Sequence, residues 1–181
     1  IKNSYRELAA ERVREEWFKW AEKSVVPSRG LKFLVATEWI EHFPEIKALI
    51  DVPQEPEWHP EGDVFIHTGH CADALVNLPE WKNADTESRI VYSLAILAHD
   101  FGKPATTHRA EKEGVERIVS PGHESAGVPP TESFLERINA PLAIRERVIP
   151  LVANHLAHFQ TVTDRALRRL AKRLEPENIY G

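Results

Sequence analysis

One stretch of the sequence, from Ile90 to Lys103, constrains the fold more than any other. Residues 90–98 are apolar on nearly every face of a helix, which predicts a buried helix. This helix runs into His99 and Asp100, whose ionisable side chains are costly to bury unless they find partners. An imidazole nitrogen and a carboxylate oxygen suit a divalent cation of intermediate hardness, and the negative end of the helix dipole favours the cation further. We therefore expect a metal site here, completed by histidine or aspartate residues from other helices.

The composition is that of one globular domain, or of a domain with an appendage, because 42% of the 181 residues are hydrophobic and 28% are charged. The sequence contains no apolar span long enough to cross a bilayer and no N-terminal export signal, so we expect no membrane anchor. Its one cysteine, Cys71, excludes an intrachain disulfide and agrees with a cytoplasmic location. The net charge of -5 argues against a broad surface for nucleic acids, although it does not exclude a local basic patch.

Apolar residues recur at helical spacing along most of the chain, and no parallel-sheet pattern or tandem repeat is present, so we predict an all-α fold. A capping box at residues 4–7 opens a first amphipathic helix that ends near Lys23. Between residues 106 and 120 the composition is irregular, and a turn at 112–114 would join two short strands. Short helical pieces are expected over 31–37 and 39–43, interrupted at Pro44. Five longer helices are expected. The first runs from Asp63 to about Leu78, and the central one is capped by Asp85 or Thr86. The third covers 122–138, where Pro129 and Pro130 kink or restart it; Pro141 opens the fourth, and the last is capped by Thr163 or Asp164 and ended by Pro176.

Three further histidines are candidates to join the dyad. His123 lies at the start of a predicted helix, and the other two lie on apolar helix faces that point toward the core. His67 shares its stripe with Val64, Cys71, Leu75 and Leu78, and His155 shares its face with Ile144, Val148, Leu151 and Val152.

A lone histidine on an apolar face is more often a hydrogen-bonded core residue than a metal ligand. Four inward histidines and an aspartate in one domain would need several separate buried partners, whereas one shared metal satisfies them all. We therefore predict that a divalent ion is bound by His67, His99, Asp100, His123 and His155.

Other polar residues give weaker signals. His70 and His158 each follow a predicted ligand by three residues, and each could face the pocket or the solvent. Lys103 lies one helical turn beyond the dyad, where it could meet a substrate phosphate as a point charge or be a solvated loop lysine. The remaining histidines are expected to face the solvent: His42, His59 and His108.

The last predicted helix carries basic residues on the side opposite its apolar face. Such a row is usually a solvated surface, but it could also contact RNA. The row consists of Arg165, Arg168, Arg169, Lys172 and Arg173, and the apolar face consists of Ala166, Leu167, Leu170, Ala171 and Leu174.

Three motifs resemble the HD superfamily of metal-dependent phosphohydrolases. They are WHPEGDVFIHT at residues 58–68, LAHDFGKP at 97–104 and GHESAG at 122–127. Within that superfamily, they look like the HD domain attached to bacterial tRNA nucleotidyltransferases, the multifunctional CCA-adding proteins. The runs ERVREE at 11–16 and FPEI at 43–46 are similar to the helical region that precedes that domain.

The resemblance implies an HD-domain helical bundle over residues 51–181, preceded by an N-terminal helical region over 1–50. It also implies a metal-dependent hydrolase of phosphate esters such as 2′,3′-cyclic nucleotides, 2′-nucleotides and phosphomonoesters. The cofactor would be a divalent ion: Mn, Ni, Co, Mg, Fe or Zn.

Residue by residue, His67, His99 and Asp100 match the family's metal motif, and His123 and His155 match further histidines beside the site. The resemblance implies that Asp100 is a ligand and a proton acceptor. His123 and His155 would bind a second metal or the phosphate, and Lys103 would stabilise the departing negative charge.

Two departures from the family pattern set the alternative. The Gly-rich nucleotidyltransferase head is not among these residues, and the superfamily's closing aspartate has no good equivalent before Gly181, since Asp164 is better explained as a helix cap. Because the sequence starts at Ile1, ends abruptly at Gly181 and contains no methionine, we interpret it as a piece of a longer protein. The missing closing aspartate indicates that its HD domain is truncated at the C-terminus. The alternative function is a non-catalytic HD-type module that binds tRNA or a partner and is accessory to a nucleotidyltransferase.

Overall fold

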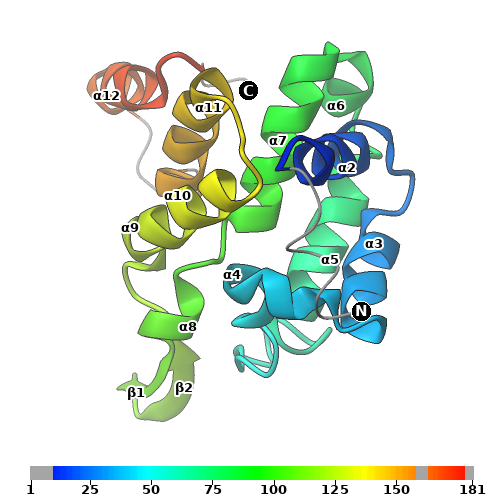
Figure 1. Cartoon of the computed structure of the whole chain (residues 1–181). Helices are drawn as coiled ribbons and strands as arrows, with labels where there is room; N and C mark the ends of the chain where they lie inside the picture. Colours follow the sequence, from blue (N-terminus) through cyan, green and yellow to red (C-terminus); the bar gives the residue numbers. More distant parts are fainter. Residues whose placement is uncertain (1–9, 158–162, 178–181) are drawn as a thin grey trace.

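The helix expected from the central apolar stretch is the centre of the fold. In the computed structural model, which describes residues 10–157 and 163–177, this helix is α7 and spans Thr86–Ala98. Asp85 caps it by accepting a hydrogen bond from the Ser88 amide at 2.7 Å. The prediction of a central buried helix is confirmed, because α7 packs against α2 (Ala10–Lys23), α5 (Val64–Leu75) and α11 (Leu142–Ala153) (Figure 1).

Helices also form most of the rest of the described chain, so the predicted all-α fold is confirmed. The first described helix ends at Lys23 as expected, and its predicted capping box lies outside the described residues. Within the described ranges, no helix is both long and apolar enough to span a membrane. The further helices are α3 (Pro27–Ala36), the 3-10 helix η1 (Trp39–His42), α4 (Pro44–Lys47), α6 (Pro79–Asn83), α8 (Lys103–Thr106), α9 (His123–Ala126), α10 (Val128–Arg137) and α12 (Asp164–Leu174).

Side-chain caps begin two of these helices where the sequence predicts them. Asp63 accepts a hydrogen bond from the Ile66 amide at 2.8 Å before α5, and Thr163 accepts one from the Ala166 amide at 3.1 Å before α12. Such caps satisfy amide groups that the first turn of a helix leaves without partners. The starts of α5 and α12 are therefore set by local sequence alone.

The helix predicted over residues 122–138 is divided in two at Gly127. The helix restarts there because Pro129 and Pro130 have no N–H group to donate to the preceding turn. Pro44 likewise begins α4 instead of only interrupting a helix. α6 and α8 were not predicted, because helices of 5 and 4 residues are too short to show a helical periodicity of apolar residues.

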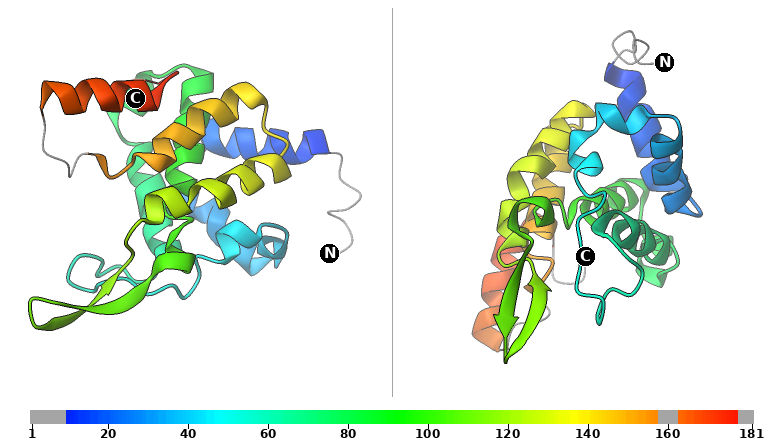
Figure 2. Two further views of the ribbon diagram at one scale, coloured as in Figure 1. Left: turned by 90° about the vertical axis from the view of Figure 1, so that its left-hand side faces the viewer. Right: turned by 90° about the horizontal axis from the view of Figure 1, so that it is seen from below.

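The two short strands expected after the dyad form an antiparallel hairpin, β1 (His108–Lys112) with β2 (Val115–Val119). Glu113 and Gly114 join them with φ values of 54° and 76°, and two positive φ angles are what a type I′ turn requires. Figure 2 shows the hairpin extending beyond the helices. Its base holds the loop before α5, because Glu55 accepts a hydrogen bond from the Ile118 amide at 2.9 Å.

An aromatic cluster fixes the chain next to the dyad. Phe101 follows Asp100 directly, and its ring lies edge-on to Phe134 with 5.7 Å between ring centres. Phe134 in turn contacts Trp17 at 5.1 Å, so residues from α2, α10 and the end of α7 share one core. This core contains residues from both sides of position 50. The boundary predicted between residues 1–50 and 51–181 stays a prediction.

Candidate metal centre

The carboxylate of Asp100 lies at the centre of the site and is only 1% exposed. Its Oδ2 atom lies 3.2 Å from Nε2 of His99, 3.8 Å from Nε2 of His67 and 2.8 Å from Nζ of Lys103. Its Oδ1 atom lies 3.3 Å from Nε2 of His123. One carboxylate therefore faces three imidazole rings and an ammonium group that come from different elements of the fold.

A close approach of two backbone segments brings His123 to Asp100. α7 ends at Ala98, and the next turn carries Gly102 against the start of α9. A Cβ atom on Gly102 would lie 2.0 Å from the carbonyl oxygen of His123 and 2.6 Å from the amide nitrogen of Gly127, distances that no side chain tolerates. Glycine is therefore required in the HDFG sequence for α9 to reach the site.

The second ring nitrogen of each of three histidines is held by the backbone. Nδ1 of His99, His123 and His155 lies 2.6, 2.7 and 2.7 Å from a carbonyl oxygen three residues earlier in the chain. A neutral imidazole that donates from Nδ1 presents a lone pair at Nε2, and this arrangement orients histidines that bind metals. All three rings are thus prepared to offer Nε2 to a cation.

The Nε2 atoms of His123 and His155 lie only 3.0 Å apart. When both rings are neutral and donate from Nδ1, each Nε2 atom carries a lone pair. Two lone pairs repel unless a proton or a cation lies between them. Two nitrogens bound to one ion with bonds of about 2.1 Å at a right angle would be about 3.0 Å apart, so the spacing suits a shared metal. Asp100, His123 and His155 each offer a ligand atom, all within 4.8 Å of one another.

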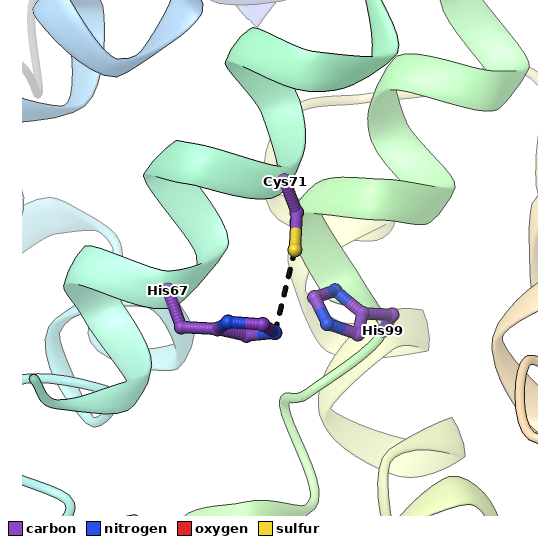
Figure 3. A group of neighbouring side chains, drawn as sticks. All are labelled: His67, Cys71 and His99. Carbon is purple, nitrogen blue, oxygen red and sulfur yellow. Dashed lines mark hydrogen bonds between the residues drawn. The ribbon is translucent and has the colours of Figure 1, made fainter. Parts of the chain in front are cut away.

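A second group of ligand atoms is formed by His67, Cys71 and His99 (Figure 3). Sγ of Cys71 lies 3.3 Å from Nε2 of His67. Nδ1 of His67 is held by Oε1 of Glu61 at 2.6 Å, so the ring turns Nε2 toward the sulfur and Asp100. His59 also contacts Glu61, with 3.2 Å between Nδ1 and Oε1.

Opposing effects set the charges of the dyad. Burial alone would lower the pKa of His99 and raise that of Asp100. Their mutual attraction outweighs burial: it raises the pKa of His99 to about 10 and, with the hydrogen bond from His123, holds the pKa of Asp100 far below its usual range. For His155, burial reinforced by the nearby His99 and His123 lowers the pKa to about 4. In the absence of metal, His99 is therefore protonated at neutral pH and His155 is not.

The same competition acts on the acidic groups beside His67. Burial would raise the pKa of Cys71, but its contacts with His67 and His99 outweigh burial and lower the pKa to about 6. Burial would also raise the pKa of Glu61, but a backbone hydrogen bond and the rings of His67 and His59 lower it to about 2. Both groups are therefore anionic near neutral pH, and they increase the attraction of this side for a cation.

The five predicted ligands, His67, His99, Asp100, His123 and His155, are brought together around this centre, and their roles stay predictions. Two features support the fit to a cation. The Nε2 atoms of His123 and His155 approach each other to 3.0 Å, and Oδ2 of Asp100 is a buried atom that accepts no hydrogen bond of good geometry from the described residues. The donor set of imidazoles and one carboxylate suits Zn, Co, Ni, Fe or Mn better than Mg.

The positions of the other polar residues test several weaker expectations. Lys103 is not a solvated loop lysine, because it is buried, pairs with Asp100 and donates a hydrogen bond to Oε1 of Gln54 at 2.7 Å. His70 and His108 are exposed, and His158 lies outside the described residues. The expectation that His42 and His59 face the solvent is wrong, because both are half-buried.

Three residues of the site were not predicted from the sequence: Glu61, His59 and Cys71. Glu61 and His59 lie in a loop, where no periodicity shows which way a side chain points. Cys71 lies four residues after His67, a spacing that puts both on one helix face, so the stripe itself contained this signal. Asp164, considered as a closing ligand, is exposed in the first turn of α12.

Comparison with known proteins confirms the resemblance seen in the motifs. The chain is 38% identical over 113 residues to a protein of Halorhodospira halophila named Multifunctional CCA protein, a match that covers 62% of this chain and 24% of that protein. It is 33% identical over 135 residues to proteins of the same name from Acinetobacter baumannii and Acinetobacter baylyi, covering 74% of this chain and 29% of theirs. The chain thus spans less than a third of the length of these relatives. No family model matches the chain, and no solved structure matches it significantly.

Proposed function

We propose that the chain is a metal-dependent phosphohydrolase that acts on small phosphate esters, as a module of a protein related to the multifunctional CCA proteins. The substrates would be 2′,3′-cyclic nucleotides, 2′-nucleotides or phosphomonoesters. One observation carries the proposal: the buried carboxylate of Asp100 faces the Nε2 atoms of His67, His99 and His123. Burying this many ionisable groups together is costly, and a bound cation that all of them share offsets the cost.

The residues that would hold the ion are His67, His99, Asp100, His123 and His155. When bound, a divalent ion polarises a phosphoryl oxygen and lowers the pKa of a bound water. Asp100 would help to hold the ion and would accept a proton from the attacking water. The backbone carbonyls that hold three of the imidazoles by Nδ1 keep those rings oriented throughout.

Lys103 would act on the substrate's charge. Its ammonium group lies 2.8 Å from Oδ2 of Asp100 and is fixed by Gln54, so it is held inside the site and does not extend into solvent. A phosphate ester bound beside Asp100 would bring its oxygens within reach of this ammonium. There Lys103 would stabilise the negative charge that develops on the leaving oxygen.

The test uses the purified chain, stripped of metal and reloaded with Mn, Co or Ni, and measures hydrolysis of 2′,3′-cyclic nucleotides and of an aryl phosphate diester. Asp100→Asn should abolish turnover. The matched control is Asp164→Asn, which makes the same chemical change at an exposed residue of α12 and should leave turnover unchanged. Equal activity in wild type and Asp100→Asn would refute the proposal.

The second candidate function is a non-catalytic module that binds tRNA or a partner protein. One observation favours it: the five basic residues of α12 are all exposed, where they could contact a polyanion. The two candidate functions differ in whether the chain needs a metal ion. A scaffold would bind tRNA in a salt-sensitive manner without any metal and would show no turnover with any metal tested.

A further inference from the structure

Cys71 occupies a position that a hydrogen bond alone does not explain. Residues four apart on a helix share a face, so α5 presents His67 and Cys71 side by side, and His99 approaches from the end of α7. Figure 3 shows the three side chains pointing toward one another. Sγ of Cys71 lies 3.3 Å from Nε2 of His67, and the three residues offer ligand atoms that all lie within 4.8 Å of one another. The contact of Cys71 with His67 and that of His99 with Asp100 account for these residues in pairs, but only a shared ion would engage all three ligand atoms at once.

Both imidazoles in this group are held at Nδ1 by another group, and this contact orients each ring as a metal ligand. Glu61 holds Nδ1 of His67 at 2.6 Å, and the carbonyl oxygen of Ile96 holds Nδ1 of His99 at 2.6 Å. In each case the ring turns its other nitrogen toward the space beside Cys71 or Asp100. A carboxylate or carbonyl that holds the far nitrogen of a histidine is the usual support of a metal ligand.

We propose that Cys71, as a thiolate, binds a metal ion together with His67 and His99. His67 and His99 of this sulfur-containing group lie nearest to Oδ2 of Asp100, whereas His123 of the oxygen and nitrogen group lies nearest to Oδ1. This inference rests on the proposed function, because the group with Cys71 and the group with His123 and His155 would belong to one metal centre. It adds a ligand, a second ion position and a preference for one class of metal.

The spacing and the donor atoms suit such an ion. Bonds of about 2.3 Å to sulfur and about 2.1 Å to nitrogen place the two ligand atoms about 3.1–3.6 Å apart, for angles between a right angle and the tetrahedral angle. Thiolate ligands select Zn²⁺, Co²⁺ or Fe²⁺ over Mg²⁺ and Mn²⁺. On binding, a lone pair of the Cys71 thiolate forms the bond to the metal, and the ion displaces the proton of His99, which passes to solvent, with no change of oxidation state.

The test is a cobalt titration of the metal-free chain, kept reduced with a phosphine, and followed by absorption. Cobalt held by nitrogen and oxygen ligands gives weak visible bands, whereas a cobalt–thiolate bond adds a strong charge-transfer band in the near ultraviolet. Cys71 is the only cysteine in the sequence, so this band can have one origin. We expect both kinds of band in the wild-type chain.

The variants sharpen the result. Cys71→Ser should lose the near-ultraviolet band, keep visible bands from the other group, and bind Zn²⁺ about 10–100-fold more weakly with little change for Mn²⁺. His70→Ala is the matched control, because His70 lies on the same helix and is exposed, and it should keep all bands. Visible bands without the charge-transfer band in wild type would overturn this inference alone. No cobalt bands of any kind would overturn both this inference and the proposed function.

Discussion

Two regions of the molecule handle charge in opposite ways. Around Asp100, cationic and anionic side chains converge from several elements and are buried or half-buried. Along α12, five basic side chains lie in parallel on one helix, and all are exposed. Only Leu174 of α12 is fully buried, so this helix contributes little to the core.

This difference in burial indicates which region favours a bound ligand. Charges removed from water cost several kcal/mol each unless they are paired. The ion pairs of Asp100 with Lys103 and His99 offset part of that cost, and a bound metal ion would offset more. Charges left in water cost almost nothing, so the basic row of α12 is stable whether or not anything binds it. The geometry around Asp100 therefore favours a bound cation, whereas that of α12 merely permits a ligand.

The largest expected effect is the stabilisation of the chain by metal. An ion that binds only the folded state at 100 times its dissociation constant adds about 2.7 kcal/mol to the free energy of unfolding. For a chain of this size, that corresponds to a rise in Tm of about 5–10 °C. Calorimetry with and without Co²⁺ measures it, and Asp100→Ala should remove most of the rise. If replacing Arg165, Arg169 and Arg173 of α12 by Gln removed the rise instead, the contrast between the two regions would be wrong.

A smaller effect is expected from the residue behind His67. Glu61→Gln keeps the shape of the side chain but removes the charge that holds Nδ1 of His67. Changes of this kind weaken metal affinity by roughly 10–100-fold. The measurement is a competition with a chelator, and Glu80→Gln, at an exposed position of α6, is the control. An unchanged affinity in Glu61→Gln would mean that His67 does not bind the ion.

The pH dependence separates the two regions. His99 has its pKa raised to about 10, so an ion must displace a proton from it at any pH below that value. If His99 alone releases a proton, metal affinity should rise about tenfold per pH unit from pH 6.5 to 9 and level off only near the raised pKa. Arginine does not titrate in this range, so any binding of tRNA by α12 should stay constant there. A metal affinity already level above pH 7 would show that His99 is not a ligand.

The parts of this molecule that the sequence predicts are those set by local chemistry. Asp63, Asp85 and Thr163 cap their helices as expected, because a cap depends on residues within one turn. The hairpin turn at Glu113 and Gly114 was predicted for the same reason. Inward-facing His67 and the dyad were visible from helical spacing, since periodicity shows which face of a helix is buried.

The parts that escaped prediction depend on contacts between distant segments. Glu61 reaches His67 from the loop before α5, which is held against the hairpin through Glu55 and closed on itself by the hydrogen bond from Gln54 to the Gly62 carbonyl oxygen. Gln54 meets Lys103 across the same loop. Neither contact leaves a periodic pattern in the sequence, so tertiary packing alone decides them. His155 was found from a face of α11, although it lies just beyond the helix end at Ala153.

The smallest effect is expected from α12. Arg165, Arg169 and Arg173 lie on one stripe of this helix at a spacing of four residues, and all three are exposed. Changing all three to Gln keeps much of the side-chain length and removes the charge. Because exposed substitutions usually alter stability by within about 0.5 kcal/mol each, the helical signal and the metal-induced rise in Tm should persist. Hydrolysis of a small phosphate ester should stay within about twofold of wild type.

The same variant decides what α12 contributes to binding. If these arginines bind phosphates, the slope of log affinity for tRNA against log salt should become less steep by about one for each arginine–phosphate pair that the variant removes. Replacing Lys19, Lys23 and Lys32 by Gln removes the same number of exposed positive charges elsewhere and serves as the control for net charge. Equal salt slopes in both variants would leave α12 as a solvated face. A weaker salt dependence confined to the α12 variant would give this helix a polyanion-binding role that is independent of the buried centre. Exposed charges contribute to binding one by one, whereas the residues around Asp100 would bind an ion as a group.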